Sequence, residues 1–409
     1  MAGRMQPVLA GVVTALVGFA SSFTVVLAGL RAVGATERQA ASGLLVLCVA
    51  SGLCAAWLGL RHRIPLSMAW STPGAALLVA TGPVPGGWPV AVGAFLVSGA
   101  LIVAAGLFPA LGRAVAAIPK PVAGAMLAGV LLPLCTAPVR ALVEVPLLAA
   151  PVVLSWLLLH RFARRWAVPG ALVVAVVAIA LTVPAGDTGG GLRPVVEVTA
   201  PQWSFSALVG LALPLFLVTM AAQNVPGAAL LVGYGYRPPL GSVLRTTGLA
   251  TLATAPAGGH AVNLAAISAA LAAGPDAHPD PDRRWIASVT AGAGLALLGL
   301  GAGAVTTLVS WAPPVLIEAV AGLALLGALA TALTSALAEP AAREAAVVTL
   351  VVTAAGVSLA GIGGAFWGLI AGCLMLLVFR RRTRPAATAP LPPSPRDGQP
   401  DQAGARQER

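Results

Sequence analysis

Two stretches of the sequence begin unusually short apolar runs: Met68-Ala69-Trp70-Ser71-Thr72-Pro73-Gly74, before a run that ends near residue 80, and Leu252-Ala253-Thr254-Ala255-Pro256-Ala257-Gly258-Gly259-His260, before a run that ends near residue 273. In each stretch, a cluster of Pro, Gly and small polar residues interrupts apolar residues. A helix needs about 20 apolar residues to cross the hydrocarbon core of a bilayer, and both runs are shorter than that. These two interruptions decide how the rest of the chain is interpreted.

The composition around them is that of an integral membrane protein. Of the 409 residues, 58% are hydrophobic and 9% are charged, whereas soluble domains carry about 25% charged residues. The apolar residues form about fourteen successive blocks, most of them long enough to span a bilayer as a helix. We therefore predict an all-α polytopic membrane protein, embedded in the lipid bilayer, with segments at residues 7–30, 38–60, 69–80, 89–108, 119–136, 142–160, 168–184, 205–224, 240–253, 259–273, 285–308, 313–337, 343–359 and 363–379.

The two halves of the chain echo each other. The third and tenth segments, which contain the interruptions, correspond in position. Ile118-Pro119-Lys120-Pro121 opens the fifth segment and corresponds to Trp311-Ala312-Pro313-Pro314, which opens the twelfth. Seven segments per half is an odd number, so the two copies must lie inverted in the membrane. Short, Gly/Pro-interrupted segments at corresponding places of such repeats mark the binding site of a transporter.

The formal net charge of +11 does not indicate a nucleic-acid partner, because the basic residues are scattered between apolar blocks. Their distribution follows the positive-inside rule. With the N-terminus inside, most Lys and Arg fall in cytoplasmic loops, and the opposite face holds Arg31, Arg38, Arg140 and Arg193. Both termini are therefore expected in the cytoplasm. Residues 383–409 are rich in Pro and polar residues and are expected to form a disordered tail.

The two interruptions are candidates for an anion site. Backbone N–H groups at the start of a half-helix carry partial positive charge and attract a carboxylate. Half-helices that begin at residues 71–74 and 258–260 would direct their N-termini into one cavity. Ser71 and Thr72 can cap a helix that includes Gly74, and Gly258 and Gly259 let a ligand approach the backbone. The alternative is that both clusters are ordinary loops beside short helices.

His260 is the one histidine that the sequence places inside a membrane segment. An ionisable group at that depth is costly and usually functional, and a histidine beside an anion can load and release a proton. The alternative is a neutral histidine hydrogen-bonded to the backbone. Glu318, about a turn into the twelfth segment, is a second candidate for proton transfer or gating, although its place near a helix start favours a solvated acid. No other carboxylate lies deep in an apolar block, so we expect no metal site and no cofactor except the coupled proton.

Amide and hydroxyl groups interrupt two further segments. Gln223 and Asn224 end the eighth segment and either bind ligand oxygens or tie helices together. Asn263, one turn beyond His260, either lines the site or caps the backbone locally. Ser22 and Phe23 in the first segment either face the cavity or allow close helix packing. We predict substrate contacts for the amide pair and for the Ser-Phe pair, with Asn263 in a secondary role.

Four motifs occur together in the chain: RIPLSMAWSTPGAALL at residues 63–78, Ala125-Met126-Leu127-Ala128-Gly129-Val130, Gln223-Asn224-Val225-Pro226-Gly227 and Gly258-Gly259-His260-Ala261-Val262-Asn263-Leu264. They resemble the bacterial benzoate/proton symporter (BenE) family, which is distantly similar to nucleobase-ascorbate and sulfate-permease transporters. The resemblance covers residues 5–380 and implies a core domain of residues 6–109 and 205–308 and a gate domain of residues 119–184 and 313–382. It also implies a short strand and a half-helix in segments 3 and 10, and often a homodimer.

The resemblance implies a function that agrees with the residues. In the nucleobase relatives, acidic residues in segments 8 and 10 handle substrate and proton, whereas the matching neighbourhoods of this chain carry Ala222-Gln223 and Gly259-His260. This departure disfavours a nucleobase and makes His260 the expected proton carrier. We expect proton-coupled uptake of benzoate or a similar small organic anion across the bacterial cytoplasmic (inner) membrane by alternating access. The alternatives are another small anion or a nucleobase on the same fold, or a passive anion channel. No enzyme is expected, because Ser71 and His260 lack a third, orienting group.

Overall fold

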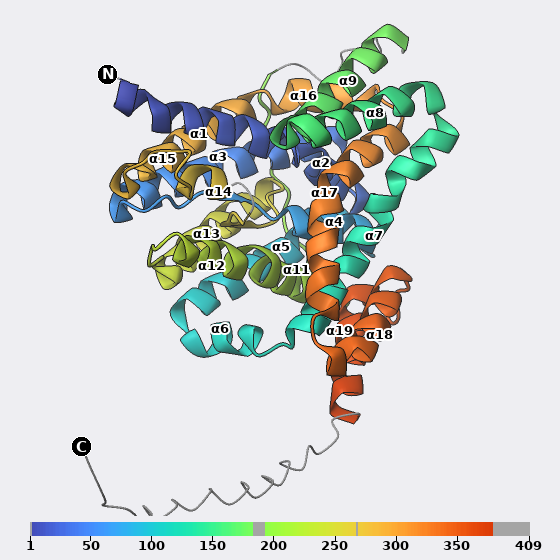
Figure 1. The fold of residues 1–409 in the computed structure, drawn as a ribbon. Helices are drawn as coiled ribbons and strands as arrows, with labels where there is room; N and C mark the ends of the chain where they lie inside the picture. The colour runs from blue at the N-terminus through green and yellow to red at the C-terminus, as the bar shows by residue number, and fades with distance from the viewer. Residues whose placement is uncertain (1, 183–192, 267–268, 379–409) are drawn as a thin grey trace, which may run out of the picture.

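The computed structural model describes residues 2–182, 193–266 and 269–378, and it is almost entirely helical (Figure 1). The first half contains α1 (Ala2–Ala20), α2 (Phe23–Ala32), α3 (Glu37–His62), β1 (Met68–Trp70), α4 (Thr72–Thr81), α5 (Trp88–Leu107), α6 (Pro109–Ala116), α7 (Lys120–Glu144), α8 (Pro146–Phe162), η1 (Arg164–Trp166) and α9 (Ala167–Thr182). The tail predicted at residues 383–409 lies outside the described residues.

The second half repeats this series. It contains α10 (Phe205–Ala207), η2 (Leu208–Ala212), α11 (Leu213–Thr219), η3 (Met220–Asn224), α12 (Val225–Gly233), α13 (Leu240–Thr254), η4 (Ala255–Ala257), β2 (Val262–Leu264), α14 (Ala269–Ala273), η5 (Pro281–Arg283), α15 (Trp285–Leu300), α16 (Ala302–Ser310), α17 (Pro314–Leu337), η6 (Pro340–Ala342), α18 (Arg343–Ala354) and α19 (Gly364–Val378). Each predicted segment has a helix in the structure, and α6 is an additional one.

Several of the helices have the length and composition of membrane spans. Among the described residues, seven helical stretches are long and apolar enough to cross a membrane, or eight when α15 and α16, which meet at a 54° bend, are taken as one span. The shorter apolar helices are α4, α8 and α19. The all-α membrane architecture is thereby confirmed, whereas the total of about fourteen segments stays a prediction.

The helix packing repeats between the two halves, as an inverted repeat requires. α5 packs on α13, and the corresponding elements α15 and α3 pack on each other. Similarly, α8 packs on α9 in the first half and α18 packs on α19 in the second. α7 and α17, which correspond to each other, form the most extensive helix pair. Each of these helix pairs therefore has an equivalent when every element is replaced by the corresponding element of the other half.

The two interrupted segments meet as a pair of short antiparallel strands. β1 pairs with β2 so that Ala69 lies opposite Asn263. The Ser71 N–H continues the ladder by donating to the Ala261 carbonyl over 3.0 Å. Backbone polar groups at membrane depth must find partners inside the protein, and the strand pair supplies them where the helices are broken.

The second interruption differs from the prediction in the place where its helix begins. We predict a half-helix start at residues 258–260, but η4 ends there, Gly258 has a φ of +96°, and the chain continues into β2. The helix of this segment, α14 (Ala269–Ala273), follows β2 in the chain. A residue with left-handed geometry is typical of the end of a helix. The predicted half-helix start at this position is therefore wrong, although the predicted strand and short helix of the segment are present.

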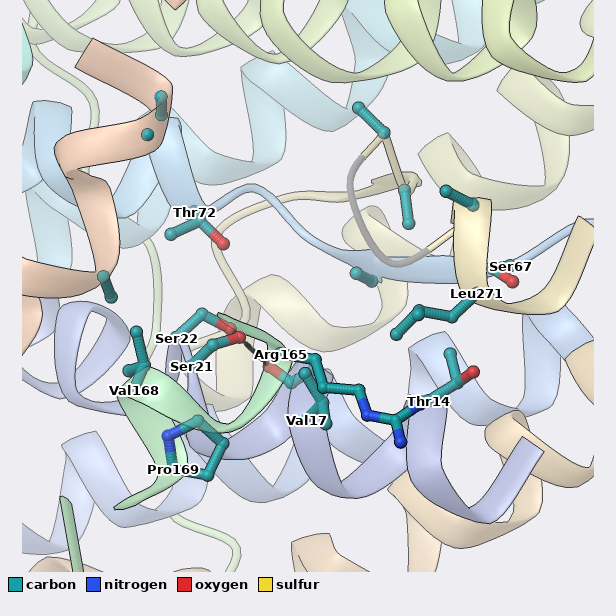
Figure 2. A pocket seen from close by; sticks show the side chains of 18 of the residues that line it. Thr14, Val17, Ser21, Ser22, Ser67, Thr72, Arg165, Val168, Pro169 and Leu271 are labelled. Carbon is teal, nitrogen blue, oxygen red and sulfur yellow. Dashed lines mark hydrogen bonds between the residues drawn. The ribbon is translucent and has the colours of Figure 1, made fainter. Parts of the chain in front are cut away.

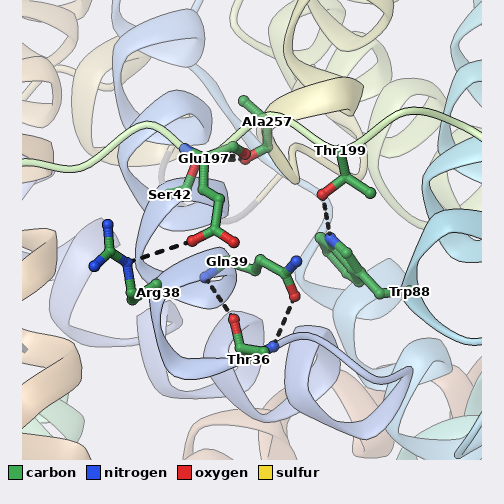
Figure 3. A network of polar contacts seen from close by, with 8 residues as sticks. All are labelled: Thr36, Arg38, Gln39, Ser42, Trp88, Glu197, Thr199 and Ala257. Carbon is green, nitrogen blue, oxygen red and sulfur yellow. Dashed lines mark hydrogen bonds and ion pairs between the residues drawn. The ribbon is translucent and has the colours of Figure 1, made fainter.

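An extended segment, residues 194–204, holds the turn before β2 in place (Figure 3). The Thr199 N–H donates to the Pro256 carbonyl over 2.8 Å. The Ser42 hydroxyl of α3 donates to the Ala257 carbonyl, also over 2.8 Å. These bonds connect the turn both to a helix of the first half and to the segment that leads into the second half.

Ion pairs neutralise three of the four arginines that the sequence analysis assigns to the outer face. On the predicted cytoplasmic side, the described residues contain one such pair, Arg283 with Asp280 at 3.4 Å. Among the described residues, most arginines of the predicted cytoplasmic side thus lie outside ion pairs, and the orientation in the membrane stays a prediction. The pairs of the outer face are Arg31 with Glu37, Arg38 with Glu197 (3.5 Å) and Arg140 with Glu318 (3.1 Å).

Candidate functional site

A cavity of about 730 Å³ separates two groups of elements (Figure 2). One wall comes from α1, β1, α4, α14 and α15, which belong to the predicted core domain. The opposite wall comes from α8, η1, α9 and α17, which belong to the predicted gate domain. The volume is typical of a small-molecule site. The polar and charged side chains that line it include Thr14, Ser21, Ser22, Ser67, Thr72, Gln223, Ser288, His160, Arg164 and Arg165.

The start of α4 presents polar groups to this cavity. Ser71 is the N-cap residue: its Oγ accepts from the Gly74 N–H over 3.1 Å and from the Thr219 hydroxyl over 2.9 Å. Pro73 has no N–H and the Gly74 N–H is bound to the Ser71 side chain, so within the described residues the Thr72 N–H is the first-turn donor left without an acceptor. Thr72 lines the cavity, whereas Ser71 and Gly74 are buried next to it.

Gln223 reaches the cavity from η3, a π-helical turn in the eighth segment. Such turns occur frequently at functional sites. Gln223 Oε1 accepts from the Ala266 N–H over 3.2 Å, which leaves the amide nitrogen as a donor for other partners. The site therefore has neutral hydrogen-bond donors from both halves of the chain.

Asn224 and Asn263 hold the strand pair and do not line the cavity. Asn224 Oδ1 accepts from the Leu264 N–H over 3.0 Å, which attaches η3 to β2. Asn263 is fully buried, and its amide finds partners for both groups when its oxygen faces the Ser71 N–H at 3.0 Å. These contacts correspond to the structural alternatives that the sequence leaves open for both residues.

The break between α1 and α2 brings Ser22 to the cavity wall. Its Oγ donates to the Gly18 carbonyl over 2.9 Å and accepts from Trp70 Nε1 over 3.1 Å. Phe23 is 3% exposed, stacks on Phe19 with 5.1 Å between ring centroids, and does not line the cavity. Ser22 thus joins α1 to β1 at the cavity, and Phe23 belongs to the packed interior.

His260 is fully buried and does not line the cavity. Its ring lies edge-on to Phe95, with 6.4 Å between centroids. Nδ1 accepts from the Ala261 N–H over 2.6 Å, and among the described residues Nε2 has no hydrogen-bond partner. An imidazole whose Nδ1 accepts carries its proton on Nε2, so this geometry holds His260 in the neutral form.

Gly258 and Gly259 make close contacts with protein and are likewise outside the cavity lining. A Cβ placed on Gly258 would lie 3.0 Å from Gly43 Cα, and one on Gly259 would lie 2.7 Å from Thr254 Cβ. The two glycines therefore allow α3, α13 and the turn before β2 to approach one another.

Glu318 is part of the exposed ion pair with Arg140 that links α17 to α7, and it does not line the cavity. Its carboxylate is one-third exposed, at 33%. This position agrees with a solvated acid near a helix start, which the sequence favours.

The sequence analysis missed the charged part of the opposite wall. Trp156 and His160 of α8 stack with 4.8 Å between ring centroids, and both line the cavity together with Arg164 and Arg165 of η1. The positive-inside rule already accounts for arginines in this connection, so their position in the sequence did not indicate a site. A Trp and a His four residues apart on one helix face were the available signal.

Comparison with known proteins identifies the family. The chain matches the model of a family described as "Benzoate membrane transport protein" over residues 3–378. The inner membrane protein YdcO of Escherichia coli is 40% identical over 371 residues, which cover 90% of this chain and 95% of the relative. The benzoate membrane transport protein of Acinetobacter baylyi is 30% identical over 382 residues, which cover 91% of this chain and 95% of the relative.

Solved structures of two anion transporters share the fold at low sequence identity. The transmembrane domain of the cyanobacterial bicarbonate transporter BicA has a TM-score of 0.56 and 17% identity, with 93% of this chain and 98% of that chain covered. The murine anion transporter Slc26a9 in its inward-facing state has a TM-score of 0.58 and 12% identity, with 92% and 68% covered. The fold and the family indicated by the sequence motifs are thereby confirmed. This chain is a multi-pass membrane transport protein, and it belongs to the benzoate membrane transport protein family.

Proposed function

We propose that this protein is a secondary transporter that carries benzoate or a similar aromatic carboxylate, together with a proton, across the bacterial inner membrane by alternating access. One observation carries the proposal: among the described residues, those that line the cavity include hydrogen-bond donors, arginines and apolar groups, and no Asp or Glu. A carboxylate finds donors there without a competing acid, and apolar walls suit an aromatic ring. The name of the Acinetobacter relative supports benzoate as the substrate.

In this proposal the carboxylate binds at the start of α4. Thr72 offers its N–H and its hydroxyl, and Gln223 offers its amide nitrogen. The first turn of the helix adds partial positive charge. Ser71 acts indirectly, because its hydroxyl caps the helix and thereby fixes the direction of the donors at Thr72.

Coupling to a proton makes the inward movement of a monoanion electrically neutral. Without it, one negative charge that enters against a potential of 100 mV costs about 2.3 kcal/mol. His260 is the proposed carrier, and its Nδ1 must first release the Ala261 N–H before a second proton can bind. Loading of His260 therefore requires a rearrangement of the turn before β2. His160, which lines the cavity, is the alternative carrier with direct access.

Alternating access requires the two walls of the cavity to move relative to each other. With both termini in the cytoplasm, η1 lies on the cytoplasmic side, and a cavity lined by η1 is open toward the cytoplasm. The predicted core would carry the carboxylate past the predicted gate to the other side. The proposal extends to a homodimer in which each chain would form its own cavity.

The test is uptake of labelled benzoate into proteoliposomes, with protein-free liposomes run in parallel to subtract the passive entry of benzoic acid. An inward proton gradient should raise the initial rate of the protein-dependent part. His260→Gln and His160→Gln then assign the carrier, because the variant that loses gradient stimulation while it still exchanges benzoate identifies it. An initial rate of protein-dependent uptake that is the same with and without the proton gradient would refute proton coupling. Uptake of sulfate or uracil, with benzoate neither transported nor competing, would refute the substrate.

A further inference from the structure

The charges that the described residues bring to the cavity all have the same sign. Arg164 and Arg165 are the charged residues in this lining, His160 adds an imidazole, and no carboxylate of the described residues lines the cavity. Four ion pairs occur among the described residues, and neither arginine takes part in them. Two exposed arginines therefore line a cavity without a counter-charge from the described residues. Such an arrangement favours the entry of an anion.

The position of these arginines places them across the cavity from the start of α4. They form η1, the connection between α8 and α9, whereas Thr72 belongs to the wall built by β1 and α4. In Figure 2, the Arg165 side chain extends from this connection toward Val17 and Thr14 of α1. Arg165 thus reaches over the boundary between the two groups of elements that must move apart during transport.

We propose that Arg165, with Arg164 beside it, is an anion-binding residue of the opposite wall, which captures the substrate carboxylate at the cytoplasmic mouth and passes it to or from Thr72. The inference rests on the proposed function and adds a specificity-determining residue to it. A guanidinium is a planar fork that matches a carboxylate with two parallel hydrogen bonds. The stacked rings of Trp156 and His160 line the same wall and offer a face to an aromatic substrate.

A general attraction of basic loops to the membrane surface is the competing explanation, and the chain contains a matched control for it. Arg161 lies in the last turn of α8, three residues before Arg164, and carries the same charge. Its guanidinium rests over the Phe162 ring at 5.5 Å, and it does not line the cavity. If the arginines only served topology or lipid contact, Arg161 and Arg165 would be equivalent. If Arg165 binds the substrate, only its substitution changes affinity.

The experiment is isothermal titration of the purified, full-length protein with benzoate, in low and in high sodium gluconate. We expect R165Q to raise Kd about five- to twentyfold, the size expected for a charge-assisted hydrogen bond in a hydrated cavity. R165K keeps the charge and loses the fork, so its Kd should lie between those of wild type and R165Q. R161Q should stay within about twofold of wild type, and salt should weaken binding to wild type more than to R165Q.

Each outcome decides the inference. A wild-type benzoate Kd in R165Q, or an equal rise of the Kd in R161Q and R165Q, would overturn it. Gel filtration of each variant and benzoate binding by R165K serve as controls for folding. A panel of acetate, sulfate and bicarbonate separates the inference from the proposed function. If wild type binds one of these anions and not benzoate, the proposed function fails. The inference then holds if R165Q binds that anion more weakly than wild type, and it fails if the two Kd values are equal. If wild type binds no anion of the panel, both fail.

Discussion

Replacement of Ser71 by alanine tests how the start of α4 is held. Ser71 Oγ accepts from the Gly74 N–H and from the Thr219 hydroxyl. Ser71 and Thr219 are both fully buried. Loss of an N-cap costs about 1 kcal/mol. The buried Thr219 hydroxyl, left without its acceptor, costs about 1–3 kcal/mol more. We therefore expect S71A to lower the free energy of unfolding by about 2–4 kcal/mol.

A double-mutant cycle separates the two contributions. Thr219→Val alone removes a donor and should cost about 1 kcal/mol. In the double variant no buried hydroxyl remains without a partner, so its loss of about 1–2 kcal/mol should be smaller than the sum of the single losses. The cycle thus assigns to the Thr219 hydroxyl the part of the S71A loss that disappears in the double variant.

The assay measures the free energy of unfolding in mixed detergent micelles. Pulse-labelling of Cys48 and Cys54 with a thiol reagent reports the fraction of unfolded protein. Both are free thiols that are buried in the folded protein and become reactive when it opens. A loss of less than about 0.5 kcal/mol in S71A, or strict additivity in the double variant, would contradict this description of the start of α4.

Substitutions at and away from the cavity should separate binding from structure. Gln223→Leu removes the amide donor, so the benzoate Kd from titration calorimetry should rise about five- to twentyfold. Gln223→Glu adds a negative charge, which repels the substrate carboxylate, and should weaken binding further. Wild-type affinity in both variants would exclude Gln223 from the site. Thr72→Val retains the shape and the N–H but loses the hydroxyl, so the KM for uptake should rise about three- to tenfold; an unchanged KM would remove this hydroxyl from the proposed contacts. Glu318→Gln breaks the exposed pair with Arg140 and should change stability by about 1 kcal/mol or less, with gradient-stimulated uptake unchanged; loss of that stimulation would make Glu318 the proton carrier.

The first half of the site was predictable from local sequence. A Ser followed by Thr-Pro-Gly is a helix start with its cap, and the structure has Ser71 as the cap of α4 with Pro73 in the first turn. Residues near enough in sequence to interact directly decide this geometry. For that reason no distant contact was needed to foresee it.

The second half depends on contacts between distant residues. The run at Gly258 and Gly259 has the composition of a helix start, but its partners are Gly43 and β1, which lie far away in the sequence. Pairing with β1 draws the chain into the strand β2, so that the helix of this segment, α14, comes after the strand. The same contacts place His260 in the interior next to Phe95, a burial that hydropathy alone could not distinguish from a place at the cavity.

The opposite wall was missed because two explanations share one signal. Arginines at the end of α8 and in η1 satisfy the positive-inside rule. Only the folded arrangement separates Arg164 and Arg165, which line the cavity, from Arg161, which does not. Sequence distance also hides the relation of this wall to Gln223. Which residues share a cavity between two packed groups of helices depends on tertiary structure.

Counterflow tests the central claim, carrier-mediated exchange of benzoate, most directly. Proteoliposomes are loaded with unlabelled benzoate and diluted into buffer that contains a trace of labelled benzoate. The pH is 8 on both sides of the membrane, and protein-free liposomes serve as the blank. A carrier that alternates its access exchanges internal for external substrate, so we predict a transient accumulation of label above its equilibrium value, reduced in Thr72→Val and in R165Q. Label that only rises to equilibrium would indicate a channel. Label that enters no faster than in protein-free liposomes would contradict transport of benzoate altogether.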